Sequence, residues 1–585
     1  MTRGMLGAGM LAACISLGTA DAQDGTLMRA MRDELDRTMA ELKLPDLKGP
    51  YFVSYTVREL SGAQASASLG AAAGSGKTSA RLLSVELRVG DPELDNTNFY
   101  SRQPIRSVGA MGYGRFPVSI PLEDEYRELR RAIWLATDAA YKQALGQFAR
   151  KQAALQNETR VDEIPDFSPS EPFEHRADGD LDPASVERVE ALARKVSAAF
   201  NGLPHVYASE VRVDQNDEVI WYVNSEGSWY RKHEPRVSVR VMAGTQAEDG
   251  TPIEDTFTAY ARTVSGLPTE DQLADRAKAL AGRLAALSAA GSLERYSGPV
   301  LFEGQAAAAM VRRVLAPKLV AARVPVADDP RFARMVQQAA SPFVDKLGSR
   351  VLPRFMAVVD DPSAVAYGDV PLLGGYQVDD EAVPSRRTEL VRRGLLRTLL
   401  STRTPVPGVP TSSGSRRGGG PAPSNLFLVA EPGLTPKDLR AELLSLVEER
   451  ELEFGIVVRR FASGGGRIAR GRAGGGPSGG GDSRRIGGVV AYKVFADGSE
   501  ELLRPMELTG FSETDFRDIV AASADSTVQT GVFVDPSGAF DRFGARRPAL
   551  VSVVVPSLLF EDATIRRPPG NIPRPPDVPH PLAVH

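Results

Sequence analysis

The chain has few of the side chains that disulfides and metal sites require. Its 585 residues include one cysteine, Cys14, and five histidines. A single thiol excludes an intramolecular disulfide. Only His580 and His585 stand at a spacing common for a metal-binding pair, and both lie at the extreme C-terminus. Zinc sites need cysteine, histidine or carboxylate ligands held in a preformed cage, so we predict no resident zinc and no other cofactor.

Excess charge and long apolar runs are also lacking, which limits the partners of the chain. The formal net charge is -4, so we predict no attraction to nucleic acid. After the first residues no apolar run approaches the roughly 20 residues of a membrane span. Apolar residues make up 42% of the chain and charged residues 25%, which is typical of a soluble globular protein.

The N-terminus has the layout of an export signal. Arg3 supplies a positive charge, residues 5–17 are weakly apolar, and Ala20-Asp21-Ala22 forms a small-x-small cleavage site. We therefore predict a signal peptide over residues 1–22 and a periplasmic or extracellular location. In the alternative reading, Leu11-Ala12-Ala13-Cys14 is a lipobox and Cys14 becomes a lipidated N-terminus. We favour simple cleavage, because apolar residues continue past the cysteine.

Hydrophobic periodicity predicts an N-terminal domain of helices and antiparallel strands over residues 23–291. Small residues between its first two strands predict a flexible loop, and Gln215-Asn216-Asp217 predicts a hairpin turn. The acidic, proline-rich residues 159–182 predict a surface excursion. The expected helices cover residues 27–43, 123–156, a segment opening at 182–183, and 269–289. The expected strands cover residues 51–58, 81–89, 205–214, 218–224, 235–243 and 255–263.

From residue 292 the composition becomes β-rich with glycine punctuation, and we predict a second domain over residues 292–565. Within it, residues 461–488 are rich in glycine and arginine and cannot bury enough side chain to fold alone. We predict a surface loop there. Residues 566–585 form a proline-rich tail, which we expect to be extended.

One segment near this domain start carries most information about function. It reads Tyr296-Ser-Gly-Pro-Val-Leu-Phe302-Glu303-Gly304-Gln305-Ala306-Ala307. It resembles the TldD/PmbA family, in which a His-Glu-x-x-x-His motif stands at this place at the head of a helix. On that pattern the histidines fall on Phe302 and Ala307 and the glutamate on Glu303. Neither a phenyl ring nor a methyl group can bind zinc.

Further segments extend the resemblance, which covers roughly residues 182–562. Asp360-Asp361-Pro362 resembles a turn of the family, and Asp379-Asp380-Glu381-Ala382 resembles its Asp-Asp-Glu-Gly segment, with alanine in place of glycine. The resemblance implies an α+β fold, with an N-terminal helix-and-antiparallel-sheet domain followed by a β-rich C-terminal TldD/PmbA-like domain. It also implies dimers enclosing a chamber, in which a zinc-bearing subunit pairs with a zinc-less one and unfolded peptides are the substrates. This chain is similar to the zinc-less type, because the cysteine that serves as a further ligand in zinc-bearing members is missing too.

Three hypotheses for function follow. The first is an exported, non-catalytic subunit in peptide or protein processing, which forms a homodimer or a heterodimer with a zinc-bearing paralogue. The second is a peptide-binding or envelope-assembly homodimer without catalysis. The third is an active peptidase with a metal site rebuilt from Asp379, Asp380 and Glu381, since adjacent carboxylates suit Ca²⁺ or Mg²⁺. For these three residues we favour a capping or solvated-loop role. Glu303 is the one retained position of the motif, and no residue is assigned as catalytic.

Overall fold

The structure is a computed structural model that describes residues 25–43, 45, 48–100, 117–157, 164–177, 179, 181, 184–329, 341–462, 485–533 and 547–568. The predicted signal peptide with Cys14, most of the predicted glycine- and arginine-rich loop, and nearly all of the tail with His580 and His585 lie outside these residues. Those assignments therefore stay predictions.

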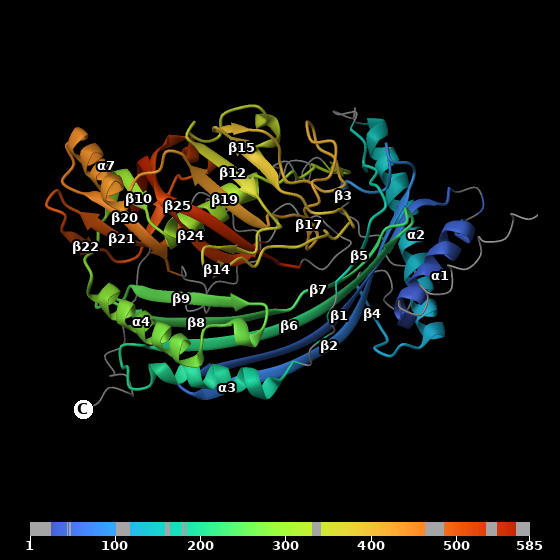
Figure 1. Ribbon diagram of the computed structural model, residues 1–585, viewed down its shortest axis with the longest axis horizontal. Helices are drawn as coiled ribbons and strands as arrows, with labels where there is room; N and C mark the ends of the chain where they lie inside the picture. The colour runs from blue at the N-terminus through green and yellow to red at the C-terminus, as the bar shows by residue number, and fades with distance from the viewer. Residues whose placement is uncertain are drawn as a thin grey trace, which may run out of the picture.

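A long, curved and mostly antiparallel sheet dominates the N-terminal part of the chain (Figure 1). β1 (Pro50–Ser68) and β2 (Ala71–Val89) form a hairpin, and β1 pairs on its other side with β6 (Ala208–Asn224). The strand order is β4-β2-β1-β6-β7-β5, with β8 pairing to both β6 and β9. The remaining strands are β4 (Val118–Ile120), β5 (Glu174–Arg176), β7 (Trp229–His233), β8 (Arg236–Gln246) and β9 (Pro252–Ala261).

The predicted flexible loop between the first two strands is wrong, because the hairpin continues through it to a turn at Leu69-Gly70. On β1, Ala63, Ala65 and Ala67 alternate with more exposed residues and are buried against a helix. Alanine, glycine and serine have low strand propensity, so the sequence suggested a loop. Their small side chains instead allow the helix to lie close to the sheet.

The predicted hairpin turn at residues 215–217 is also wrong, since β6 runs through these residues without interruption. Gln215 pairs with Ala63 of β1 on one side and with Val237 of β8 on the other. Backbone pairing on both sides therefore overrides the turn preference of this polar triplet. The predicted excursion over residues 159–182 likewise contributes a strand, β5, which pairs in parallel with β7.

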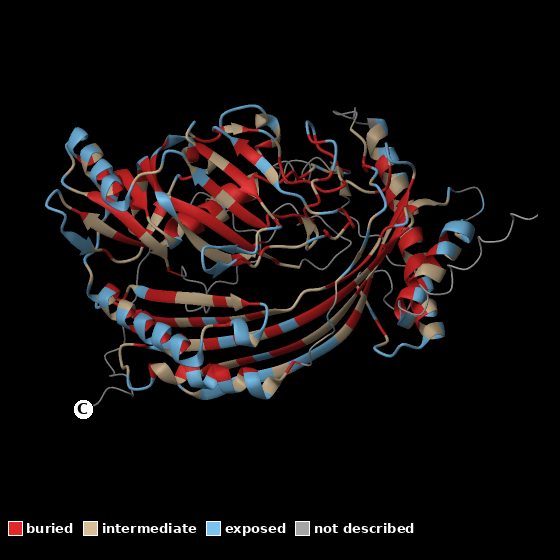
Figure 2. Cartoon of the chain, in the orientation of Figure 1, coloured by how far each residue is buried: buried red, intermediate tan, exposed pale blue. Residues whose placement is uncertain are grey.

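Helices cover one face of this sheet. In β1, Val53, Tyr55 and Val57 pack against α1 (Gly25–Glu41) and α2 (Tyr126–Asn157). Further along the same face, the buried alanines of β1 pack against α3 (Val186–Ser197), which also contacts α4 (Glu270–Ala289). Figure 2 shows the helices exposed on their outer sides and buried toward the strands. The predicted helices over 27–43, 123–156 and 269–289 are confirmed, whereas α3 begins after its N-cap Ser185, later than predicted.

An eleven-stranded sheet forms the C-terminal part of the described chain. Its order is β10-β20-β21-β23-β25-β19-β12-β15-β16, with β22 beside β21 and β24 beside β25. The longest hairpin joins β24 (Ile519–Phe533) and β25 (Ala549–Arg566), and β25 also pairs with β10 (Arg295–Phe302). The other strands are β12 (Met356–Asp360), β15 (Thr388–Arg392), β16 (Leu395–Leu396), β19 (Asn425–Ala430), β20 (Gly455–Phe461), β21 (Arg485–Val494), β22 (Glu500–Leu502) and β23 (Met506–Thr509).

The remaining helices and short strands belong to both parts of the chain. Both ends of the predicted glycine- and arginine-rich loop are strand instead, because β20 extends to Phe461 and β21 starts at Arg485. The helices are α5 (Gln305–Met310), α7 (Pro436–Glu449), the π-helix η3 (Val311–Leu315) and the 3-10 helices η1 (Ala198–Phe200), η2 (Val264–Gly266), η4 (Ala316–Lys318), η5 (Val344–Lys346) and η7 (Glu513–Asp518). Two-stranded sheets pair β3 (Phe99–Tyr100) with β11 (Val326–Ala327), β13 (Ala366–Tyr367) with β14 (Val370–Pro371), and β17 (Arg416–Arg417) with β18 (Gly420–Pro421).

The two large sheets face each other, and the helix-free face of the N-terminal sheet looks toward the C-terminal part (Figure 1). Each sheet has its own hydrophobic core, and a small shared cluster joins them, in which Tyr222 and Tyr230 pack near Val378 and Ala382. The predicted α+β fold class is therefore confirmed. Within the described residues no helix is both long and apolar enough to cross a bilayer.

Candidate functional site

The segment that resembles the zinc motif forms the junction of β10 and α5. Phe302 ends the strand and is fully buried, with ring centroids 6.4 Å from Phe461, 6.2 Å from Phe511 and 5.4 Å from Phe560. Ala307 lies in the helix and is also fully buried in the same core. Both positions that would carry histidines are thus packed with apolar groups, and these residues do not fit a zinc ion.

Glu303 lies between them, and its carboxylate is held by two arginines. Arg440 donates from Nε at 3.2 Å and Arg459 donates from Nε at 3.0 Å. The same two arginines also bind Glu500, at 2.9 Å and 2.7 Å. Burial opposes the charge of Arg459, but its hydrogen bonds to Glu500 and Glu303 outweigh this and raise its pKa. Two carboxylates and two guanidinium groups therefore form a closed, neutral cluster.

The predicted acidic triplet lies between the two sheets, where each carboxylate has different partners. Asp379 is buried and accepts backbone N–H groups from Glu381 at 2.8 Å, Val383 at 2.9 Å and Arg416 at 3.0 Å. Glu381 accepts from Arg416 Nη1 and from the backbone N–H of Arg403, both at 2.8 Å. Burial, together with the neighbouring Glu381 charge, raises the pKa of Asp379 to about 7. These two carboxylates stabilise loops and arginines rather than converge on one point.

Asp380 connects the two sheets. Its carboxylate accepts from Lys232 Nζ at 2.7 Å, from Arg547 Nη2 at 3.0 Å and from the Gly418 N–H at 2.7 Å. Burial acts against its charge, but Lys232 and Arg547 outweigh burial and hold its pKa far below the usual range. The sequence did not identify these two partners, because they stand 148 and 167 residues away along the chain and no local pattern marks them.

The same network continues into the N-terminal sheet. Arg547 also binds Glu218 at 3.1 Å and Glu234 at 2.8 Å. Glu234 has its pKa lowered to about 2, because Arg547 and Lys232 outweigh its burial. On the other side of the triplet, Arg403 binds Glu226 of the N-terminal sheet at 2.8 Å. Buried ion pairs therefore fix the relative position of the two sheets.

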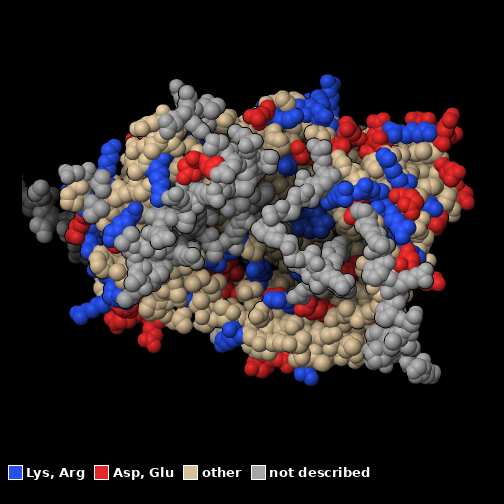
Figure 3. All heavy atoms as spheres, turned by 180° about the vertical axis from the view of Figure 1, so that it is seen from behind, with Lys and Arg blue, Asp and Glu red and all other residues tan. Residues whose placement is uncertain are grey.

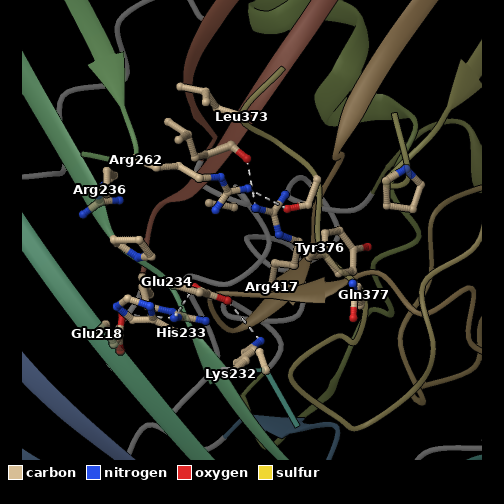
Figure 4. A pocket seen from close by; sticks show the side chains of 18 of the residues that line it. Glu218, Lys232, His233, Glu234, Arg236, Arg262, Leu373, Tyr376, Gln377 and Arg417 are labelled. Atoms are coloured by element: carbon tan, nitrogen blue, oxygen red, sulfur yellow. Dashed lines mark hydrogen bonds and ion pairs between the residues drawn. The ribbon is translucent and has the colours of Figure 1, made fainter. Parts of the chain in front are cut away.

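A cavity of about 1400 Å³ lies beside this network, between the sheets. It exceeds the roughly 300–1,000 Å³ of ordinary small-molecule pockets. Figure 4 shows Arg262, which follows β9, and Arg417, which lies in β17, extending into it. Seen from behind, the molecule is hollowed between its two halves, and Lys and Arg side chains lie in the hollow (Figure 3).

Two histidines, His175 and His233, line this cavity. His233 pairs with Asp217 at 2.5 Å, and burial, with a smaller effect of Lys232, lowers the pKa of His175. His205 contacts the backbone carbonyl of Ala281 at 3.2 Å. In the part of the chain that the structure describes, no three histidine, cysteine, aspartate or glutamate side chains are placed to hold a metal ion.

Comparisons with known proteins agree with this architecture. Residues 179–285 match the PmbA/TldA metallopeptidase central domain, and residues 297–567 match the PmbA/TldA metallopeptidase C-terminal domain. The metalloprotease MJ0996 of Methanocaldococcus jannaschii is 37% identical over 71 residues, which span 12% of this chain and 15% of that relative.

Solved structures are similar over nearly the whole chain. TldE from Thermococcus kodakarensis has a TM-score of 0.56 at 13% identity and covers 92% of this chain and 99% of its own. A candidate modulator of DNA gyrase from Bacteroides thetaiotaomicron has a TM-score of 0.55 at 14% identity, covering 92% and 98%. At these identities the structures establish a shared fold, while the two domain matches together span more than half of the sequence. The chain belongs to the PmbA/TldD family of metallopeptidase-related proteins.

Proposed function

We propose that this chain is an exported, non-catalytic member of its family that takes part in peptide or protein processing as one subunit of a dimer. The observation that carries the proposal is the packing around Glu303. The two positions expected to bind zinc are buried apolar residues, Phe302 and Ala307. Without a metal to lower the pKa of water, a glutamate generates only a weak nucleophile.

The state of Glu303 itself supports the same conclusion. Its two carboxylate oxygens are engaged by Arg440 and Arg459, and Glu500 shares both arginines. A general base needs a free lone pair within reach of the proton it removes. Glu303 instead stabilises the contact between β10, β20 and α7.

The proposed location and partner rest on the sequence. The pattern of residues 1–22 supports export, and the loss of zinc ligands supports a partner that supplies catalysis. In this proposal the partner is a zinc-bearing paralogue, because a second copy of this chain would lack the same ligands at Phe302 and Ala307.

A peptidase assay with a matched pair of variants tests the proposal. The purified chain, with added zinc, is incubated with an unfolded polypeptide, alongside Glu303→Gln and Glu500→Gln. Glu500 is a suitable control because it is 23% exposed, against 25% for Glu303, and binds the same arginines. We expect no zinc-dependent cleavage by any of the three proteins. Cleavage that Glu303→Gln abolishes and Glu500→Gln retains would overturn the proposal.

The cavity between the sheets supports a second proposed function, a homodimer that binds peptides without cleaving them. Its volume and its mixture of polar and apolar lining residues suit an extended chain better than a compact cofactor. A co-purification experiment distinguishes the two proposed functions. A zinc-bearing paralogue that co-purifies favours the first, and a stable self-sufficient homodimer favours the second. Neither uses a rebuilt carboxylate site, because Asp379, Asp380 and Glu381 are all engaged in ion pairs or hydrogen bonds.

A further inference from the structure

Apart from Arg176, the charged side chains that line the cavity form two groups. One group is balanced, with three cations, Arg58, Lys232 and Arg547, paired to three anions. The anions are Glu218, Glu234 and Asp380, and each of them contacts two of these cations. This group contributes no net charge to the cavity.

Three further arginines in the wall have no carboxylate partner among the described residues. Arg236 donates to the Pro548 carbonyl at 3.3 Å, and Arg262 donates to the Gly375 carbonyl at 3.2 Å. Arg417 stacks on a tyrosine ring and donates to two backbone carbonyls, at 2.8 Å and 2.9 Å. A guanidinium group has five N–H donors, so most donors of Arg236 and Arg262 remain available.

These arginines also come close to one another. In Figure 4 the guanidinium groups of Arg262 and Arg417 lie next to each other inside the cavity, although Arg262 follows β9 and Arg417 lies in β17. Loss of surrounding water lowers the pKa of Arg262; Glu234 counteracts this, while the charge of Arg417 lowers the pKa further. Like charges placed together in a partly enclosed space create a field that attracts anions. The overall charge of the chain is negative, so this field is local to the cavity.

Apolar side chains also line the cavity. They include Val365, which is 80% exposed, together with Pro371, Leu372 and Leu550, whose carbonyl accepts from Arg417. Val365 precedes the hairpin of β13 and β14, whose Tyr367 and Val370 are also exposed. A cavity lined by both apolar side chains and cations without a carboxylate partner among the described residues can bind a ligand that carries apolar side chains and carboxylates.

We propose that this cavity binds acidic peptides, with their carboxylates on Arg236, Arg262 and Arg417 and their apolar side chains against the wall around Val365. Arginine suits this role because its planar fork binds carboxylates through two parallel hydrogen bonds. The inference rests on the proposed peptide-handling function and names the class of peptide. The carboxylates come from aspartate and glutamate side chains or from a free C-terminus.

Peptide binding to the full chain tests the proposal. The probe is a short fluorescent peptide of alternating glutamate and leucine, measured by anisotropy at low and at physiological salt. Two relatives of the probe distinguish the source of the carboxylate, one with glutamine in place of glutamate and one with an amidated C-terminus. The variant is Arg236→Gln/Arg262→Gln, which leaves the more structural Arg417 intact. The control, Arg131→Gln/Arg392→Gln, removes two charges from side chains that are 52% and 66% exposed and do not line the cavity.

We expect the acidic probe to bind more tightly than the glutamine probe and to weaken as salt screens the charges. The cavity variant should bind about tenfold more weakly, because it loses two charge-assisted contacts, while the control stays within about twofold. Unfolding midpoints of both variants establish that they are folded. Equal binding of all three probes, or equal weakening by both variants, would overturn the inference. Neither result depends on zinc, so the outcome is separate from that of the peptidase assay.

Discussion

The position of the two sheets depends on Asp380, and its replacement by asparagine makes a sharp test. The carboxylate lies 2.7 Å from Lys232 Nζ and 3.0 Å from Arg547 Nη2, and the side chain of Lys232 is 8% exposed. Asparagine has nearly the same shape as aspartate but no charge. Its amide nitrogen is a donor and would face the donors of Lys232, Arg547 or Gly418. The variant therefore leaves two buried cations, Lys232 and Arg547, with less negative charge beside them.

The expected loss of unfolding free energy depends on the ion pairs that Lys232 and Arg547 keep in the variant. Breaking a buried pair on one side costs about 3–5 kcal/mol. Lys232 keeps Glu234 at 3.2 Å, and Arg547 keeps Glu218 at 3.1 Å and Glu234 at 2.8 Å. These contacts offset part of the loss, so we expect the lower end, about 3 kcal/mol of unfolding free energy at pH 7.

The dependence on pH has a defined sign. The folded pKa of Asp380 is lowered by Lys232 and Arg547, whereas an unfolded aspartate titrates near about 3.9. The stabilisation is thus fully present above about pH 4 and is lost as the pH falls further. The deficit of Asp380→Asn should be constant between about pH 6 and 8 and shrink below about pH 4.

Urea unfolding followed by fluorescence and circular dichroism measures the effect. The control is Asp369→Asn, the same chemical change at an exposed position between β13 and β14, which should change stability by less than about 0.5 kcal/mol. A loss for Asp380→Asn no larger than that of the control would refute the ion-pair account, and so would an undiminished loss in acid.

Three further changes test the cores and the loops. Burial raises the pKa of Asp360 to about 7, so the folded state keeps a proton that the unfolded state releases near about pH 4. Stability should therefore fall as the pH rises from about 4 to 7. Urea titrations should find this fall smaller by about 4 kcal/mol in Asp360→Asn, which keeps the contribution of Asp379, whose pKa is also raised to about 7. Phe302→Ala removes a fully buried ring and should cost about 3–5 kcal/mol in the same assay, whereas a cost below about 1 kcal/mol would mean that this position is not part of the core. Gly394 has φ +75°, and a Cβ there would meet the Leu352 carbonyl at 2.2 Å, so Gly394→Ala should lower stability by more than about 2 kcal/mol. The matched change Gly368→Ala, at φ +55° with no atom within 4 Å, should cost only about 1 kcal/mol; equal losses at the two glycines would contradict the steric argument.

Local patterns predicted the helices well. The apolar spacing of Met28, Met31 and Leu35 predicted α1, and all three are buried. Thr269 before an amphipathic run marks α4, and its side chain completes a capping box with Gln272. Such signals depend on residues within one or two turns, which a single sequence contains.

Strands were harder, because their partners are distant. The alanines at 63, 65 and 67 carry no strand signal of their own and become strand through pairing with β6, whose Val213 stands opposite Ala65. Tertiary pairing thus overrides local preference. The ion pairs of Asp380 were even harder to predict from the sequence, because they connect the two parts of the fold.

Two departures from the family pattern were visible in sequence and have physical counterparts. Ala382, where glycine is usual, has φ +61°, a conformation that an alanine adopts at a cost of roughly 1–2 kcal/mol. Phe302 and Ala307 stand where zinc ligands were expected and are both fully buried. The cavity arginines could not be predicted, because only the fold brings Arg262 and Arg417 together.

The central claim is that this chain carries no catalytic zinc, and elemental analysis of the mature protein tests it most directly. The protein is purified without a tag or a chelator, and zinc is measured per chain. We predict less than about a tenth of an equivalent. Near-stoichiometric zinc that survives deletion of the tail bearing His580 and His585 would contradict the account, because the metal would then need ligands among residues that we describe as structural.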